Sequence, residues 1–279
     1  MAADIVFADV KHALAEDVGH GDLTAALIPA NAMSSAQVLC REDAVLSGQA
    51  WFDEVFHQLN NDITVEWLAN DGDGIAAGSI ICRLTGLARP LLTGERTALN
   101  FLQTLSGTAT LTRQFVSAIK TTDARVLDTR KTPPGLRQAL KYAVRCGGAN
   151  NHRMGLYDGI LIKENHIHAA GSLRAALDLA HATAAKGTLI EIEVEDLEML
   201  CAALNAGATR ILLDNFTIDE LRQAVQKNTS DAKLEASGNI SLDNIRTIAE
   251  TGVDYISVGA LTKNIRAIDL SMGFDVTWQ

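Results

Sequence analysis

A cluster of cationic residues lies between Asp128 and Ile167, in a chain that is acidic as a whole. The 279 residues include 24 Lys and Arg against 34 Asp and Glu, so the formal net charge is −10. A local reversal of sign indicates a small, highly anionic ligand, because guanidinium and ammonium groups bind carboxylates and phosphates. The cluster consists of Arg130, Lys131, Arg137, Lys141, Arg145, His152, Arg153 and Lys163.

Carboxylates follow short β-branched runs farther along the chain. Glu193 and Asp214 are suited to Mg²⁺, which takes one or two carboxylates together with substrate oxygens and water. The alternative is a salt bridge from either carboxylate to Lys163. Glu191 and Glu195 share the strand alternation of Glu193, so the pattern alone does not choose among the three.

Small residues follow the last two β-branched runs, as Ser237-Gly238-Asn239 and Val258-Gly259-Ala260. In α/β barrels the last strands often bind a phosphate through backbone N–H groups. Glycine is common at any β–α turn, but its occurrence at two successive turns favours a phosphate site.

The elements that must position these residues alternate between strand and helix. From Arg125 onward the β-branched runs are RVLD, DGILIKEN, TLIEIEVE, TRILLDNF, KLEASGN and DYISVGAL, separated by amphipathic helical segments at 172–185, 197–207, 218–228 and 242–252. This order predicts parallel strands whose C-terminal ends gather the reactive groups. Six strands, or seven with a hidden one, predict an irregular α/β barrel.

The first part of the chain has a different pattern. Short extended runs and Gly-rich turns between residues 22 and 105 predict an antiparallel sheet. The expected fold class is therefore α/β, an irregular six- or seven-stranded α/β barrel (111–279) with a smaller N-terminal α+β open-sandwich domain (1–110). An N-terminal helix and a linking helix at 93–120 belong to this scheme, and the tail after Leu270 is a candidate to return to the first domain.

The cationic segment reads DTRKTPPGLRQALKYAVRCGGANNHRMGLYDGILIKENHI and resembles the core of the quinolinate phosphoribosyltransferases, the decarboxylating nicotinate-nucleotide pyrophosphorylases. The family runs DTRKT-x-PGLR, KYAV-x-CGG, NHR-x-GL and LIK-D/E-NH occur in order. Further similar runs are GERTALNFLQTLSGTAT (94–110), IEIEVEDL (190–197), ILLDN (211–215), EASGNI (235–240) and ISVGALT (256–262). Pro133, Ala149 and Glu164 depart from the usual family text without removing a charged group.

The resemblance implies a Mg²⁺-dependent glycosyltransferase (pentosyltransferase) of de novo NAD synthesis. It would transfer phosphoribose from phosphoribosyl pyrophosphate to quinolinate with decarboxylation, giving nicotinate mononucleotide, pyrophosphate and CO₂. It implies Lys131, Lys163, Glu193 and Asp214 as catalytic residues, the last two also as metal ligands. The implied substrate contacts are Arg96, Thr129, Arg130, Lys131, His152, Arg153, Lys163, Ser237, Gly238, Asn239, Val258, Gly259 and Ala260. It further implies a homodimer in which Arg96 reaches the neighbouring subunit's site.

Guanidinium groups suit a planar dicarboxylate best, because each makes two parallel charge-assisted hydrogen bonds. Arg130 and Arg153 are therefore our first candidates for quinolinate. Arg137, Lys141 and Arg145 are spaced four apart, which favours a solvated helix face or a dimer rim.

Several other classes of site are excluded or disfavoured. His166 and His168 would share one face of a strand, but no zinc-type spacing surrounds them, so a structural or hydrogen-bonding role is favoured. There is no GxSxG elbow, no Walker A loop and no GxGxxG after a strand. The Gly-turn segment DGDGIAAGSIICRLTG is similar to a lipoyl or biotinyl carrier hairpin, but residues 42–95 contain no acceptor lysine.

The bulk properties favour a soluble cytoplasmic enzyme. Hydrophobic residues make up 47%, and the four cysteines are far apart with no CxxC pair. The N-terminus lacks a signal-peptide pattern and no apolar run could cross a bilayer, so we expect no membrane partner. A pI of about 5.1 disfavours nucleic acid.

Two alternatives remain open. A related phosphoribosyltransferase could act on nicotinate or another nitrogenous carboxylate, although two arginines favour a dicarboxylate. A catalytically silent anion sensor would retain the cations but could lose Glu193 or Asp214, and both are present.

Overall fold

The computed structural model describes residues 3–275, which form two compact units. Unit 1 combines the residues up to 113, residues 133–148 and the residues from 264 onward, whereas unit 2 combines residues 114–132 and 149–263. The chain thus leaves unit 1, returns to it for one helix, and returns again at its end. Of the residues assigned to domains from the sequence, 1–2 and 276–279 lie outside the described part.

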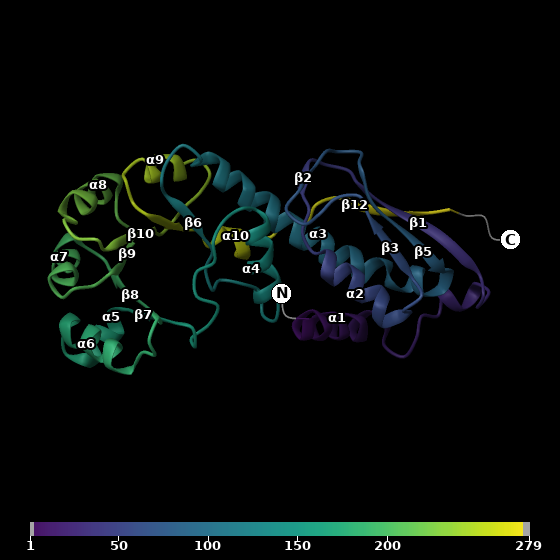
Figure 1. Ribbon diagram of the computed structural model, residues 1–279, viewed down its shortest axis with the longest axis horizontal. Helices are drawn as coiled ribbons and strands as arrows, with labels where there is room; N and C mark the ends of the chain where they lie inside the picture. The colour runs from purple at the N-terminus through teal and green to yellow at the C-terminus, as the bar shows by residue number, and fades with distance from the viewer. Residues whose placement is uncertain (1–2, 276–279) are drawn as a thin grey trace. The chain divides into compact units, whose positions relative to one another are not determined.

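Unit 1 is built on an antiparallel sheet with the order β12-β1-β5-β3. Its strands are β1 (Met33–Cys40), β3 (Thr64–Trp67), β5 (Ile80–Leu87) and β12 (Leu270–Phe274), and β2 (Ala44–Val45) pairs with β4 (Gly74–Ile75). Alternate residues of β1 are buried, as expected for a sheet covered on one face. Helices α1 (Ala3–Val18), α2 (Gln49–Leu59) and α3 (Ala88–Ala118) pack there, and a short 3₁₀ turn covers Ala25–Leu27 (Figure 1). Trp51, Phe52 and Phe56 of α2 lie at the centre of the core.

Helix α4 (Arg137–Cys146) belongs to unit 1, although the sequence analysis assigned its residues to the barrel. The cause is hydrophobic: Ala139, Leu140 and Ala143 are wholly buried in the core of unit 1. In addition, the hydroxyl of Tyr142 donates to Oδ2 of Asp71 at 2.7 Å. The basic segment reads as one continuous motif, but its residues are divided between the two units.

Unit 2 contains a six-stranded parallel sheet with the order β6-β11-β10-β9-β8-β7. The strands are β6 (Arg125–Leu127), β7 (Gly159–Ile162), β8 (Leu189–Val194), β9 (Arg210–Asp214), β10 (Lys233–Ser237) and β11 (Tyr255–Ser257). They are the six runs expected from the sequence. An isolated parallel bridge from Leu127 to Asn150 extends the sheet beyond β6. Among the described residues no ladder joins β6 to β7, so the barrel is incomplete.

Helices flank the strands of unit 2 (Figure 1). They are α5 (Glu164–Ala170), α6 (Leu173–Thr183), α7 (Leu197–Asn205), α8 (Ile218–Lys227), α9 (Ile245–Ala249) and α10 (Ala260–Lys263). Four of these, α6 to α9, coincide with the helical segments expected from the periodicity. Side chains of Ser172, Asp196 and Thr217 cap α6, α7 and α8 by accepting backbone N–H bonds.

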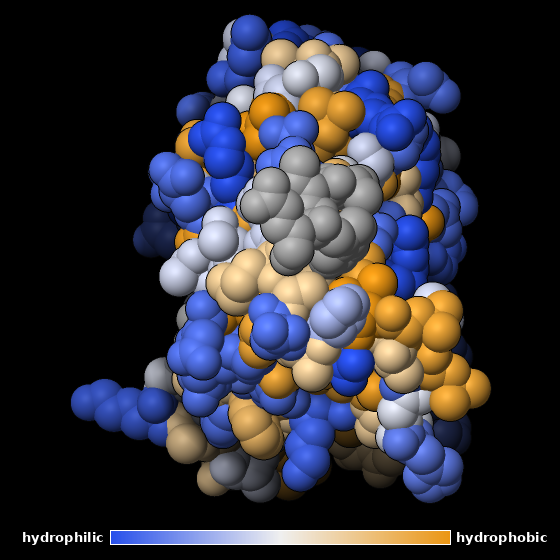
Figure 2. Space-filling model, turned by 90° about the vertical axis from the view of Figure 1, so that its right-hand side faces the viewer, coloured by the Kyte–Doolittle hydropathy of each residue, from blue (hydrophilic) through white to orange (hydrophobic). Residues whose placement is uncertain are grey.

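The surface of unit 1 mixes polar and apolar side chains. Figure 2 shows mostly hydrophilic residues on the displayed face, with a hydrophobic group toward one edge. Such mixing is ordinary for an exposed protein surface. Within residues 3–275, no helix combines the length and apolar character needed to span a bilayer.

Candidate active site

A cavity of about 330 Å³ lies in unit 2, lined by residues that follow or end its strands. Nine of the residues proposed from the sequence line it together: Thr129, Arg130, Lys131, His152, Arg153, Lys163, Glu193, Asp214 and Ser237. Leu161, Leu212 and Ser257 complete the lining. The parallel sheet brings these residues together because the carboxyl ends of its strands share one edge.

Two glutamates of β8 lie on the same face of the sheet, one buried inside the unit and one at the cavity. Glu191 and Glu193 share that face by alternation, and Glu193 reaches the cavity while Glu191 is wholly buried. Nζ of Lys163 lies 2.5 Å from Oε2 of Glu193. The salt bridge considered as the alternative to metal binding is therefore present in the structure.

Beneath the cavity lies a buried charged network centred on Arg210. Its Nε donates to Oε1 of Glu191 at 3.0 Å, and its Nη2 donates to Oε2 of Glu235 at 2.5 Å. The hydroxyl of Ser257 donates to the second oxygen of Glu235. The guanidinium also lies over the ring of Tyr255, 3.5 Å from its centroid. Strands β8 to β11 each contribute to this network.

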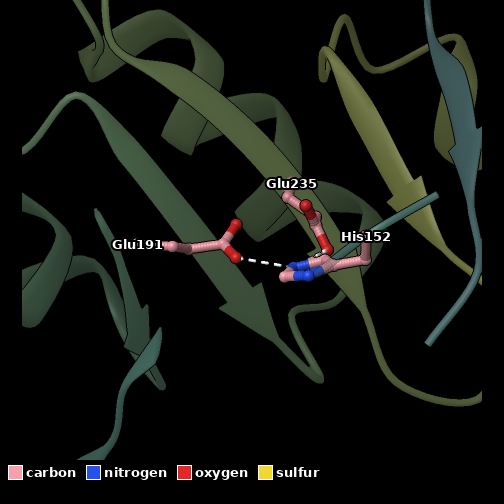
Figure 3. Close-up of side chains that lie close together, drawn as sticks. All are labelled: His152, Glu191 and Glu235. Carbon is pink, nitrogen blue, oxygen red and sulfur yellow. Dashed lines mark hydrogen bonds and ion pairs between the residues drawn. The ribbon is translucent and has the colours of Figure 1, made fainter. Parts of the chain in front are cut away.

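His152 connects the network to the cavity. Figure 3 shows its imidazole pointing toward Glu191 and Glu235, with Nε2 2.7 Å from Oε2 of Glu191 and 3.6 Å from Oε1 of Glu235. The Nδ1 atom accepts the backbone N–H of Arg153 at 2.7 Å. An acceptor at Nδ1 places the proton on Nε2, which donates to Glu191. Both ring nitrogens are thus engaged within the protein.

The pKa values of the network follow from burial and mutual charge. Burial raises the pKa of Glu235 to about 7, and the negative charge of Glu191 acts in the same direction. Burial alone would raise the pKa of Glu191, but hydrogen bonds and charges from His152 and Arg210 outweigh it and lower this pKa. Burial would lower the pKa of His152, whereas the two glutamates raise it. Glu235 is therefore the carboxyl of the pair that more readily holds a proton.

His152, Glu191 and Glu235 also lie close enough together to resemble a metal site. The guanidinium of Arg210 already contacts both carboxylates, so a cation is built into the cluster. A second cation would add uncompensated positive charge in a buried place. The arrangement fits a structural network better than a metal centre.

Asp128 fixes the loop that carries His152. Its buried carboxylate follows β6, and its Oδ1 accepts the backbone N–H of His152 at 2.9 Å. Its Oδ2 accepts from Nδ2 of Asn151 at 2.5 Å. The sequence analysis missed Asp128, Arg210 and Glu235 as site-forming residues. The available signal was a charged residue at a buried strand position, which is rare unless the charge is paired.

Two guanidinium groups face the cavity. Burial lowers the pKa of Arg153, and the positive charge of Arg130 lowers it further, so the two groups lie close enough to repel each other. Arg153 is held by a bond from its Nη1 to the carbonyl of Gly159 at 3.0 Å. The negative charges of Glu191 and Asp158 act on this pKa in the opposite direction.

The backbone of the cationic loops is fixed by local bonds. The Thr129 hydroxyl accepts the N–H of Lys131 at 3.1 Å, and the Thr262 hydroxyl donates to the carbonyl of Lys131 at 2.8 Å. The N–H of Lys163 donates to Nδ1 of His166 at 3.0 Å, at the start of α5. His166 therefore has the hydrogen-bonding role expected for it. His166 and His168 both lie on α5, so they do not share the strand face that the disfavoured metal-site interpretation required.

The segments proposed for phosphate follow β10 and β11. Ser237 lines the cavity, and Gly238 and Asn239 follow it with positive φ angles of 103° and 49°. A Cβ on Gly259 would lie 3.2 Å from Cδ of Lys131, so this glycine permits the lysine to pass close by. Val258 is wholly buried and its N–H donates to the carbonyl of Leu127 at 2.9 Å.

The remaining cations lie in unit 1. Arg96 is exposed on α3, and Arg145 is exposed on α4 with its guanidinium 5.6 Å from the ring centroid of Tyr142. The expectation of a solvated face was wrong for Lys141, which is wholly buried. Leu140, Ala143 and Val144 of α4 are also wholly buried, so Lys141 lies in a part of the helix that is shielded from solvent.

Comparison with known proteins gives a consistent result over nearly the whole chain. Residues 22–106 match the family model described as quinolinate phosphoribosyl transferase, N-terminal domain, and residues 108–273 match that of the C-terminal domain. A probable nicotinate-nucleotide pyrophosphorylase (carboxylating) of Bacillus subtilis is 42% identical over 268 residues, which cover 96% of this chain and 92% of the relative.

Solved structures agree with the sequence comparison. The nicotinate-nucleotide pyrophosphorylase from Francisella tularensis matches with a TM-score of 0.93 and 45% identity, covering 99% of this chain and 98% of that one. NadC from Streptococcus pyogenes matches with a TM-score of 0.94 and 37% identity, with the same coverage of both chains.

Proposed function

This chain belongs to the quinolinate phosphoribosyltransferase family, and we propose that its unit 2 cavity is where the family reaction takes place. The enzyme transfers phosphoribose from phosphoribosyl pyrophosphate to the ring nitrogen of quinolinate, and the 2-carboxylate leaves as CO₂. The products are nicotinate mononucleotide, pyrophosphate and CO₂, in de novo NAD biosynthesis. The observation that carries the assignment to this cavity is the gathering of four cations, Arg130, Lys131, Arg153 and Lys163, with the carboxylates of Glu193 and Asp214.

Arg130 and Arg153 are the proposed quinolinate contacts. Two like charges facing one cavity favour a ligand with two negative groups, because each carboxylate can pair with one guanidinium fork. A monocarboxylate such as nicotinate offers one carboxylate to the two guanidinium forks, whereas quinolinate offers two. The cavity therefore supports the dicarboxylate over the nicotinate alternative.

The sugar phosphate is proposed to lie toward β9 and β10. Ser237, Gly238 and Asn239 would bind the 5′-phosphate through backbone N–H and hydroxyl groups. Asp214 and Glu193 would face the ribose hydroxyls and the pyrophosphate. Gly259 and Ala260 follow β11 beside Lys131 and complete this region. The N–H of Val258 is used within the sheet, so we propose only packing for that residue.

Catalysis in this arrangement needs no protein nucleophile. The cavity residues would hold the two anions so that the ring nitrogen faces C1 of the ribose, which gains oxocarbenium character as pyrophosphate leaves. Lys131 and Lys163 would offset the charge of the departing pyrophosphate or of the reacting carboxylate. Once the nitrogen is quaternised, the C2–carboxylate bond breaks and CO₂ leaves. The positive ring nitrogen stabilises the electron pair left on C2, and a proton from solvent then bonds to that carbon.

We propose Mg²⁺ as the metal, held by Glu193 and Asp214. Both carboxylates line the cavity, and their oxygens are the ligand type that Mg²⁺ prefers together with substrate oxygens. When bound, the ion would neutralise charge on the pyrophosphate. Lys163 now pairs with Glu193, so it would have to release that oxygen or share it. Activity lost in EDTA and restored by MgCl₂ would support this assignment, and full activity in EDTA would contradict it.

We propose that the active enzyme is a homodimer in which Arg96 serves the neighbouring subunit's cavity. Arg96 is an exposed cation on α3 of unit 1, whereas every residue that lines the cavity belongs to unit 2. A cytoplasmic location is also proposed. Cys40, Cys82, Cys146 and Cys201 are all free thiols, which is the usual state in a reducing compartment.

The reaction is tested by measuring CO₂ and pyrophosphate release from the purified protein with phosphoribosyl pyrophosphate, MgCl₂ and quinolinate. Nicotinate replaces quinolinate in the control. Equal release of both products with quinolinate alone is the expected result. Pyrophosphate release with nicotinate would support the alternative of a related phosphoribosyltransferase that acts on nicotinate. Binding of quinolinate without turnover would support the alternative of a catalytically silent anion sensor.

A further inference from the structure

Asn215 directly follows the cavity-lining residue Asp214 of β9 and has an unusual backbone conformation. Its φ is 58°, and within residues 3–275 Asn239 is the other non-glycine residue with positive φ, at 49°. Asparagine tolerates this region better than most residues, but two such residues near one site are uncommon. They follow β9 and β10, which are neighbours in the sheet.

The side chain of Asn215 contacts both proposed halves of the sugar-phosphate site. Its Nδ2 donates to Oδ2 of Asp214 at 2.8 Å, and its Oδ1 lies 3.5 Å from Nδ2 of Asn239. Its backbone N–H donates to the carbonyl of Ser237 at 2.9 Å. One residue therefore contacts the proposed metal ligand and the proposed phosphate loop.

Gly238 shows how closely the amide of Asn215 approaches that loop. A Cβ on Gly238 would overlap Oδ1 and Cγ of Asn215, and the glycine also has φ of 103°. The loop is further tied by Asn244, whose Nδ2 donates to the carbonyl of Asn239 at 2.9 Å. The loop conformation and the Asn215 side chain thus depend on each other.

We propose that Asn215 is a positioning residue that joins the Asp214 carboxylate to the Ser237–Asn239 loop, so that phosphate binding and divalent-cation binding reinforce each other. This inference rests on the proposed function of the cavity. The amide donates to Oδ2 of Asp214, so we assign Oδ1 of this cavity-lining carboxylate to a cation or a ribose hydroxyl. The same amide supports the loop that receives the phosphate. A ligand that orders the Asp214 carboxylate would therefore favour the binding-competent form of the Ser237–Asn239 loop, and a ligand that orders the loop would favour that of the carboxylate.

The test compares wild type with Asn215→Gly and Asn215→Ala. Glycine accepts positive φ and removes only the amide, whereas alanine also introduces backbone strain. Ribose 5-phosphate binding is measured by calorimetry with and without MgCl₂, quinolinate binding is measured separately, and KM for phosphoribosyl pyrophosphate is determined. Asn205→Gly, an exposed asparagine at the end of α7, is the matched control.

In Asn215→Gly we expect about a fivefold weaker affinity for ribose 5-phosphate without metal, because one side-chain hydrogen bond to each subsite is lost. The gain in affinity on adding MgCl₂ should shrink, KM for phosphoribosyl pyrophosphate should rise, and quinolinate affinity should stay at the wild-type value. An unchanged effect of MgCl₂, or an equal loss of quinolinate affinity, would overturn the proposal. Failure of the proposed function would be distinguishable, since it would show as wild-type protein that turns over no quinolinate.

Discussion

Nε2 of His152 lies 2.7 Å from Oε2 of Glu191, a carboxylate with no exposure to solvent. Because Nδ1 of the same ring accepts the backbone N–H of Arg153, the imidazole is fixed at both nitrogens. His152 was implied as a substrate contact, and it does line the cavity. Its bonds indicate that it acts by holding the backbone that carries Arg153, and that a proton-transfer role would first require breaking one of them.

Replacing Glu191 should therefore affect stability. In Glu191→Gln, Arg210 and His152 lose a buried negative partner, and we expect the free energy of unfolding to fall by about 2–4 kcal/mol. Denaturant unfolding followed by circular dichroism measures this change. Glu198→Gln, on the exposed side of α7, should stay within about 0.5 kcal/mol of wild type. Similar values for both variants would show that the network contributes little.

Replacing Arg153 should affect catalysis more than folding. Arg153→Ala removes a charge-assisted fork from the cavity, which should cost about 2–4 kcal/mol of transition-state binding, measured as kcat/KM for quinolinate. Arg222→Ala serves as the control, because its guanidinium makes a surface pair with Asp219. Wild-type-like turnover by Arg153→Ala would remove this residue from the site.

The proposed sharing of sites between subunits predicts complementation. Arg96→Ala and Lys163→Ala chains should each be inactive, and mixing them after dissociation and reassociation should restore partial activity. The restored sites would combine Arg96 from one chain with Lys163 from the other. Each variant reassociated with itself is the control. No recovery, with subunit exchange verified by differential labelling, would mean that each site is built within one chain.

Gly238 and Gly171 offer a matched pair for the phosphate loop. Both have positive φ, at 103° and 86°, but a Cβ on Gly238 would overlap Asn215, whereas nothing lies within 4 Å of one on Gly171. Gly238→Ala should weaken ribose 5-phosphate binding about tenfold or more, because the loop must move. Gly171→Ala should lower stability by about 1 kcal/mol and leave binding unchanged. Equal binding by the two variants would place the phosphate elsewhere.

The raised pKa of Asp53 in unit 1 predicts that the stability of the fold depends on pH independently of the active site. Burial raises the pKa of Asp53 from 3.8 to about 6, against the lowering effect of its bond from Nε1 of Trp67. The folded state binds this proton more tightly than the unfolded state. Protonated Asp53 therefore stabilises the fold fully below about pH 3.8, and this stabilisation is lost as the pH rises through about 6. Relative to wild type, Asp53→Asn should therefore gain stability between pH 4 and pH 7. Thermal unfolding at both values measures it, and a constant difference between the two proteins would contradict the assignment.

Much of unit 2 could be predicted from the sequence, because local patterns determine it. Short β-branched runs alternating with amphipathic segments specify parallel strands with crossover helices, and all six strands and four helices were found at the expected places. The same topology places Lys163, Glu193 and Asp214 at adjacent strand ends. Together with the family resemblance, these patterns named nine of the residues that line the cavity before any distance was known.

Tertiary packing decided what the patterns left open. The basic segment is continuous in sequence, yet α4 is drawn into unit 1 because its apolar face is buried there, and Lys141 is buried with it. Alternation could not rank Glu191 against Glu193. Their depth in the sheet separates them: Arg210 and His152 bind the buried Glu191, while Glu193 meets Lys163 at the cavity. Such pairings join residues distant in sequence, and they depend on sheet order and burial, which no local periodicity encodes.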